Sequence, residues 1–193
     1  ATMLSGAAIV DGALLLIAGN EKCPQPQTKE HLVALQITGL KQVIVVQNKV
    51  DLVSHEEALE NHEQIISFLA NTEYKDAPII PLSARANVNV DMLLVAIQEF
   101  IKTPPRKHAG EPLMLVARSF DINKPGSKPE KLVGGVLGGT VKQGKFAVGQ
   151  EVEVTPGYMV EEKNRKVWQP LHTKHPQIFS GGAPVQEILP GGS

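Results

Sequence analysis

The stretch VIVVQNKVD, residues 43–51, decides the fold of this chain. Its first four residues are apolar and β-branched without interruption, and such a run predicts a strand of a parallel sheet that is buried on both faces. The polar residues from Asn48 onward then follow the carboxyl end of that strand. Open α/β sheets bind their ligands at this edge. The stretch therefore predicts a strand over residues 43–47 that leads into a polar binding loop.

Strand and helix patterns alternate on both sides of this stretch. Short apolar runs predict strands, and apolar residues at helical spacing predict helices. The strands are expected over residues 13–17, 43–47 and 79–82, and the helices over residues 28–37, 56–70 and 90–101. Ser54 followed by Glu57 predicts a capping box at the start of the second helix. On one face of that helix we expect Leu59, Ile65, Ile66 and Leu69. The alternation indicates an α/β fold with a parallel sheet and crossover helices.

A second domain is predicted after the proline-containing segment at residues 103–107. From there the apolar period changes to two, which is typical of strands. The strands are expected over residues 113–119, 133–141, 151–154 and 166–169. Frequent glycines between them favour a small antiparallel β-barrel. We therefore divide the chain into residues 1–108 and residues 109–193, the second domain being incomplete at its end.

The segment GTVKQGK, residues 139–145, resembles a phosphate-binding loop up to its last position. That position is Phe146, where such a loop needs a hydroxyl for magnesium and a helix immediately afterwards. Because strand-like alternation follows instead, we interpret the segment as a hairpin turn.

Asn48, Lys49 and Asp51 predict a loop that reads guanine. The Watson–Crick edge of guanine offers an N1–H and an amine side by side, and the Asp51 carboxylate can accept both. Adenine would leave that carboxylate desolvated and unpaired, which discriminates strongly against it. Asn48 can bridge the base and a neighbouring loop, while the aliphatic part of Lys49 can lie on the purine face.

Ser83, Ala84 and Arg85 supply the second part of the predicted base site. They follow the apolar run at residues 79–82, so they are expected at the same sheet edge as Asn48. The small Ser83 permits a close approach, and the Ala84 N–H is expected to donate to the guanine carbonyl.

The composition is that of an ordinary globular chain. With 193 residues, 42% hydrophobic residues and a net charge of −1, it can bury a core, and it lacks the overall basic charge of a protein bound chiefly to nucleic acid. Its one cysteine, Cys23, excludes an internal disulfide. No apolar stretch is long enough to span a bilayer. We expect a cytoplasmic protein without a membrane partner.

GTP hydrolysis needs parts that the sequence does not show. A GTPase uses a phosphate-binding loop, a switch threonine and a magnesium-binding aspartate. None of these motifs is recognisable here, so we expect no catalytic residue and no metal ligand in this chain. Either the chain is a fragment or hydrolysis is absent, and we favour the fragment.

Three motifs carry a resemblance to a known family. They are NEKCPQPQTKEH at residues 20–31, RSFDINKPG at residues 118–126 and KLVGGV at residues 131–136. With them the chain resembles, over essentially its whole length, the gamma subunit of eukaryotic and archaeal translation initiation factor 2. Only residues 175–179 look unusual, because the family has an apolar strand there.

The resemblance implies a fold and a function. The fold would be part of a P-loop GTPase sheet of the Ras type, the carboxyl-terminal part of a GTP-binding domain, followed by the β-barrel called domain II. The function would be to bind GTP or GDP, to carry methionylated initiator tRNA to the small ribosomal subunit, and to join an alpha and a beta subunit in a heterotrimer. GTP would be hydrolysed during initiation, with Mg²⁺ bound only in the complete protein.

Basic and aromatic residues of the second domain are the candidates for tRNA contact, because they can hold phosphates or stack on bases. The principal candidates are Arg118, Lys124 and Lys131. The wider set adds Lys128, Lys163, Arg165, Lys166 and Trp168. For Trp168 we expect barrel packing instead, and for His172 and His175 ordinary strand positions and not a metal pair.

Two alternative functions stay open. One is a tRNA-delivering elongation factor of the Tu or selenocysteine type, against which residues 23–28 argue. The other is a nucleotide-free scaffold or RNA-binding module, which would show no response to guanine nucleotides.

Overall fold

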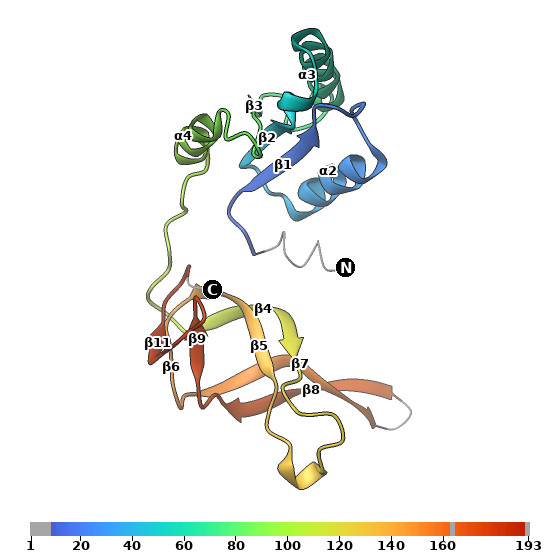
Figure 1. Ribbon diagram of the computed structural model, residues 1–193. Helices are drawn as coiled ribbons and strands as arrows, with labels where there is room; N and C mark the ends of the chain where they lie inside the picture. The colour runs from blue at the N-terminus through green and yellow to red at the C-terminus, as the bar shows by residue number, and fades with distance from the viewer. Residues whose placement is uncertain (1–8, 163–164, 192–193) are drawn as a thin grey trace. The chain divides into compact units, whose positions relative to one another are not determined.

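The computed structural model describes residues 9–162 and 165–191. Internal contacts divide the chain into two compact units, Ala1–Pro104 and Pro105–Ser193, called here the first and second unit (Figure 1). Among the described residues, none of the helices has the length and apolarity needed to cross a membrane.

The first unit contains a three-stranded parallel sheet with the order β1-β2-β3. The strands are β1 (Ala13–Ala18), β2 (Val43–Asn48) and β3 (Ile79–Pro81). The helices are α2 (Pro26–Thr38), α3 (His55–Leu69) and α4 (Val90–Phe100), with the 3₁₀ turn η1 (Val50–Leu52) directly after β2. These elements confirm the predicted alternation of strands and helices within one or two residues at each end.

Strand β2 is buried on both faces because it lies between β1 and β3 and between two layers of helices (Figure 1). Val43 and Val45 pack into one core with Leu35 of α2 and Ile65 of α3. Ile44 and Val46 pack into a second core, where they meet Ala96 of α4 and Leu82. The continuous apolar run is therefore explained by alternation, since successive side chains supply opposite cores.

The predicted face of α3 is partly wrong. Ile65 and Leu69 are buried as expected, whereas Leu59 and Ile66 are about half exposed. The buried face of α3 runs from Leu69 and Ile65 back to Asn61, four residues before Ile65. The amino-terminal part of this buried face is therefore polar. Leu59 and Ile66, seven residues apart, share a neighbouring stripe that faces outward.

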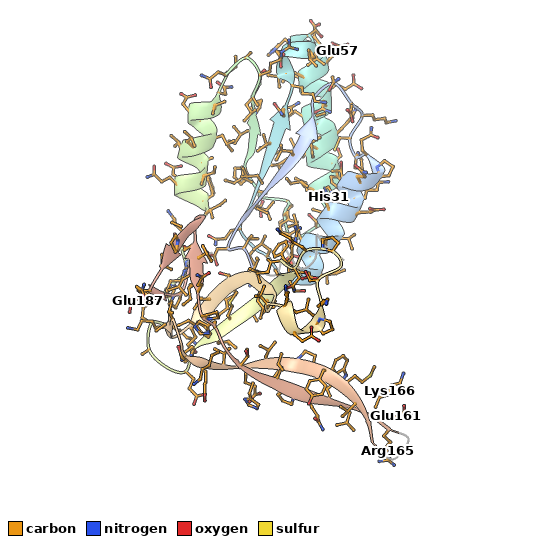
Figure 2. The ribbon with its side chains drawn as sticks, turned by 60° about the horizontal axis from the view of Figure 1, so that its bottom comes forward. His31, Glu57, Glu161, Arg165, Lys166 and Glu187 are labelled. Carbon is orange, nitrogen blue, oxygen red and sulfur yellow. The ribbon has the colours of Figure 1, made fainter. Side chains whose placement is uncertain are left out.

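The start of α3 confirms the predicted capping box. Ser54 Oγ accepts a hydrogen bond from the Glu57 N–H, and Glu57 Oε2 accepts one from the Ser54 N–H. Glu57 stands at the first turn of the helix (Figure 2). The capping box sets the start of α3. It therefore also sets the end of the polar loop that follows β2.

Tyr74 lies in the turn between α3 and β3 and is part of the first core. Its side chain is 2% exposed, and its hydroxyl donates to the Leu40 carbonyl at 2.8 Å. Burial raises the pKa of Tyr74 above its ordinary value, with the Glu73 carboxylate as a second cause. The hydroxyl thus satisfies a carbonyl that would otherwise be buried without a partner.

The second unit consists of antiparallel strand pairs. The strands are β4 (Leu113–Phe120), β5 (Val136–Gln143), β6 (Phe146–Ala147), β7 (Glu151–Glu162), β8 (Arg165–Lys174), β9 (Ile178–Ser180), β10 (Ala183–Val185) and β11 (Glu187–Ile188), with the 3₁₀ turn η2 (Pro129–Lys131) between β4 and β5. Within the described part of the chain they pair as β4-β5, β7-β8, β9-β10 and β6-β11. The period-two pattern thus correctly predicted antiparallel strands, and β9 begins inside the unusual residues 175–179.

The false phosphate loop at residues 139–145 is a strand and a turn. No helix follows it, as expected: β5 continues to Gln143, Gly144 takes a φ of 68°, and β6 begins at Phe146. The interpretation as a hairpin is wrong, because β5 pairs with β4 while β6 pairs with β11. The turn at Gly144 therefore connects the β4-β5 strand pair to the β6-β11 strand pair.

Replacing Tyr74 with phenylalanine tests the buried hydroxyl. We expect Tyr74→Phe to destabilise the first unit by about 1–2 kcal/mol, because the Leu40 carbonyl loses its donor without gaining water. Amide hydrogen exchange at Val45 measures this unit separately from the other. The control is Tyr158→Phe in the second unit, whose hydroxyl bonds to Gln169 at an exposed site. Equal effects on Val45 exchange in both variants would contradict the assignment.

Replacing Glu57 with glutamine tests the capping box through pH. Hydrogen bonds from the Ser54 backbone and side chain lower the pKa of Glu57 below its ordinary value. A carboxyl with a lowered folded pKa stabilises the fold above its unfolded pKa, and this contribution is lost as the pH falls through the folded pKa. We therefore expect Glu57→Gln to be less stable than the parent at neutral pH and equal to it in acid.

The stability difference is measured by amide exchange of α3 across the acidic range. Glu56→Gln is the matched control, because Glu56 stands one residue earlier in the same turn and has no side-chain hydrogen bond among the described residues. The same pH dependence in both variants would count against the capping box.

Candidate nucleotide-binding site

The two predicted base-reading loops meet at the carboxyl edge of the parallel sheet. Strands β2 and β3 run side by side, with Gln47 opposite Pro81. Asn48 Oδ1 then accepts a hydrogen bond from the Ala84 N–H at 3.1 Å and another from the Lys49 N–H at 2.8 Å. The structure thus joins the two motifs, which are 36 residues apart, through the side chain that ends β2.

Ser83 builds the second loop from within. It is completely buried, its Oγ accepts from the Ala86 N–H at 3.0 Å, and its backbone pairs in both directions with Val88. These contacts shape a tight turn that presents Ala84 and Arg85, both exposed. The Ala84 N–H, expected to face a guanine carbonyl, has Asn48 as its partner in this structure.

Lys49 turns the chain out of the strand. Its φ of 65° is in the left-handed region, uncommon for a residue with a side chain, and it caps η1 through a bond from the Leu52 N–H to its carbonyl. Its ammonium lies 3.8 Å from Glu21 Oε1, and both side chains are about half exposed, at 48%. Backbone strain of this kind is tolerated where the surrounding structure over-determines it.

Asp51 presents a free carboxylate. It lies in η1 and is exposed. Within the described ranges its carboxylate has no hydrogen-bond or ion-pair partner, and the same holds for the Nδ2 of Asn48. The end of β2 and the turn that follows it therefore carry a carboxylate with two acceptor oxygens and an amide donor, the groups needed to read a purine with two adjacent donors.

A buried amide pair beneath these loops was missed in the sequence. Gln47, 1% exposed, donates from Nε2 to Asn61 Oδ1 at 2.9 Å and to the Ala58 carbonyl at 2.8 Å. Asn61, 4% exposed, donates from Nδ2 to the Glu21 carbonyl at 2.7 Å. The available signal was Gln47, the polar residue that directly follows the apolar run at residues 43–46.

Two surface hollows of the first unit lie away from Asp51. The larger is lined by residues on the loop after β1 and on α3, including Cys23 and Phe68. Burial raises the pKa of the Cys23 thiol to about 11, so the thiol stays protonated and unreactive. The smaller hollow lies between β1 and the start of α2 and includes Glu21. Neither is lined by Asn48, Asp51 or Ala84.

The principal tRNA candidates lie on or beside an ordered connection in the second unit. Arg118, Lys124 and Lys131 are all exposed. Asn123 holds the connection by exchanging two hydrogen bonds with the backbone of Val133, at 2.8 and 2.9 Å. Its own N–H also donates to Asp121, and this bond lowers the pKa of that carboxyl.

The β7–β8 hairpin corrects the expectation for Trp168. This side chain is 55% exposed and stands opposite Met159 in the strand register, so it does not pack in a core. Glu161, Arg165 and Lys166 gather at the far end of the same hairpin (Figure 2). Lys163, another candidate, lies outside the described residues. Two strands alone cannot enclose an indole ring, which explains the exposure.

His172 and His175 occupy separate places in the second unit. His172 Nε2 lies 3.9 Å from Glu153 Oε2, and the ring of His175 is 2.8 Å from the Ala147 carbonyl. Over residues 9–162 and 165–191, no three His, Cys, Asp or Glu side chains form a group that could hold a metal ion.

Comparison with known proteins identifies the family. The family described as "Elongation factor Tu GTP binding domain" matches residues 1–103. Translation initiation factor 2 subunit gamma of Pyrococcus furiosus is 54% identical over 191 residues, which are 99% of this chain and 46% of that protein. The same subunit of Archaeoglobus fulgidus is 55% identical over 192 residues, covering 100% of this chain and 45% of that protein.

Among solved structures, elongation factor SelB from Methanococcus maripaludis, crystallised with the GTP analogue GppNHp, is similar with a TM-score of 0.74 and 26% identity. The match covers 98% of this chain and 38% of that one. A bacterial selenocysteine-specific elongation factor is similar with a TM-score of 0.74 and 25% identity.

The chain spans about half the length of the curated relatives that it matches. Its family match covers the first unit, and the similarity to the gamma subunits extends through the second. The chain therefore belongs to the translational GTPase family defined by the elongation factor Tu GTP-binding domain, with the gamma subunits of initiation factor 2 as close relatives.

Proposed function

We propose that this chain reads the guanine base of GTP and GDP as part of a translation initiation factor. The observation that carries the proposal is the exposed carboxylate of Asp51, which has no partner among the described residues and follows by three residues the Asn48 side chain that ties the two loops together. In this proposal residues 1–108, which contain the first unit, are the carboxyl-terminal part of a GTP-binding domain.

Each residue of the site has a distinct task. Asp51 accepts the N1–H and the amine of guanine in parallel. Asn48 Oδ1 accepts from the Ala84 N–H in this structure, that N–H turns to the guanine carbonyl when the base binds, and the Asn48 Nδ2 is available to donate to the base. The aliphatic part of Lys49 covers one purine face. Ser83 shapes the turn, and Ala84 and Arg85 form the wall opposite Asp51.

Residues 109–193, which make up most of the second unit, would serve as domain II of the factor. We propose that it helps to hold methionylated initiator tRNA, with Arg118, Lys124 and Lys131 on phosphates. The complete factor would work with alpha and beta subunits on the small ribosomal subunit and would hydrolyse GTP. Identities of 54–55% to initiation factor subunits against 25–26% to selenocysteine elongation factors favour initiation over the elongation alternative.

Replacing Asp51 with asparagine tests the base-reading role. An amide offers one acceptor and one donor, so Asp51→Asn should weaken guanosine binding at least tenfold and favour xanthosine, which has a carbonyl in place of the guanine amine. Amide chemical-shift titrations of the 193-residue chain with guanosine, xanthosine and adenosine measure weak binding directly. Asp91→Asn on α4 is the control for the loss of one carboxylate.

Two outcomes would contradict this role. Equal shifts with guanosine and adenosine in the parent chain would favour a nucleotide-free scaffold. An unchanged preference in Asp51→Asn would remove Asp51 from the site while leaving other base contacts possible.

We also predict the response to phosphates and magnesium. The loops described here contact only the base, so GDP and guanosine should bind this chain with similar, weak affinity, and chelation of Mg²⁺ should change neither. Isothermal titration with and without a chelator measures this. Tight, magnesium-dependent binding of GDP would show that the chain holds phosphates as well.

A further inference from the structure

We propose that Glu21 is a positioning residue of the base site and acts through Lys49. This inference rests on the proposed function, since it concerns how the purine face is covered. Glu21 belongs to the loop after β1, and its carboxylate lies 3.8 Å from the Lys49 ammonium. Lys49 in turn belongs to the loop after β2, so the pair bridges two neighbouring loops.

Buried amide side chains of β2 and α3 hold the backbone of Glu21 in place. Asn61 donates to the Glu21 carbonyl at 2.7 Å, and Asn61 is itself held by Gln47 at 2.9 Å. Both amides are almost fully buried, so breaking either bond would leave a desolvated polar group. Because Gln47 directly precedes Asn48, the position of Glu21 is coupled to the strand that delivers the base-reading residues.

A second connection fixes the two loops side by side. The Gly19 N–H donates to the Asn48 carbonyl at 2.7 Å. A Cβ at position 19 would lie 3.3 Å from that carbonyl oxygen, so the absence of a side chain allows the close approach. Glu21 lies two residues after Gly19, and Lys49 lies one residue after Asn48. Both side chains therefore project from loops that this hydrogen bond holds in place.

The ion pair between Glu21 and Lys49 acts in base binding and not in the stability of the fold. Both side chains are about half exposed, and an exposed ion pair contributes little to stability because water screens it. What Glu21 does provide is a preferred direction for a long, flexible side chain. With its ammonium drawn toward Glu21, Lys49 loses less conformational freedom when its aliphatic part covers a base.

The matching of charge and position supports a specific partner for Lys49. Among the described residues, Glu21 is the one carboxylate within ion-pair distance of this ammonium. The left-handed backbone at Lys49 turns the chain out of the strand at that residue, and Asp51, two residues later, has no ion pair over residues 9–162 and 165–191. The Lys49 cation is thus directed to Glu21, and the proposed acceptor role of Asp51 does not depend on it.

A double-mutant cycle separates positioning from a structural effect. The variants are Glu21→Gln, Lys49→Met and the two combined, in the 193-residue chain, each titrated with guanosine and followed by amide chemical shifts. Lys49→Met keeps an apolar side chain and removes the charge. We expect Glu21→Gln to weaken guanosine binding about threefold, on the order of one exposed ion pair, and to have no effect when Lys49 is methionine.

Glu99→Gln on α4 is the matched control, because it removes the same charge at an exposed position of the same unit. Its guanosine affinity should equal that of the parent. Amide exchange of β2 should also be the same in Glu21→Gln and the parent, since the buried amide pair bonds to the backbone of residue 21 and not to its side chain.

The other outcomes overturn either the positioning role alone or the proposed function as well. An unchanged guanosine affinity in Glu21→Gln, or an equal loss in both Lys49 backgrounds, overturns the positioning role and leaves the proposed function standing. A parent chain that does not distinguish guanosine from adenosine overturns the proposed function itself, and the positioning role with it.

Discussion

The burial of β2 on both faces is the constraint on which the rest of the structure depends. Its alternate residues supply two cores, so Val43 to Val46 cannot carry polar side chains without leaving them desolvated. Polar chemistry is therefore confined to the strand's end, where Gln47 is satisfied by Asn61 and the following residues reach the surface. Position along one strand thus separates the groups that hold the fold from those that can meet a ligand.

Much of the first unit could be predicted because its signals are local. An uninterrupted apolar run, a Ser–Glu pair three residues apart and helical spacing each depend on a few neighbouring residues, and the corresponding elements are where they were expected. The predictions failed where a residue's surroundings come from elsewhere in the chain. Leu59 and Ile66 are apolar at helical spacing, but the sheet lies under the stripe that contains Asn61.

The candidate site shows the same division. The loops that carry Asn48 and Ser83 could be located from the strands before them, since parallel strands end at a common edge. The hydrogen bonds of Gln47 and Asn61 could not be predicted. These two residues are 14 positions apart, and Asn61 bonds to the carbonyl of Glu21, which lies 40 positions before it. In the second unit, period two predicted strands, but which strands pair depends on long-range contacts, and the exposure of Trp168 follows from that pairing.

The bond from the Ala84 N–H to Asn48 has a kinetic consequence if the chain reads guanine as proposed. Because the Ala84 N–H already has a partner, an arriving base exchanges one partner for another at this position and gains little enthalpy there. A departing base likewise finds its place taken at once by the amide oxygen. Such a site favours rapid turnover of its occupant, and leaves long residence to be conferred by contacts outside these two loops.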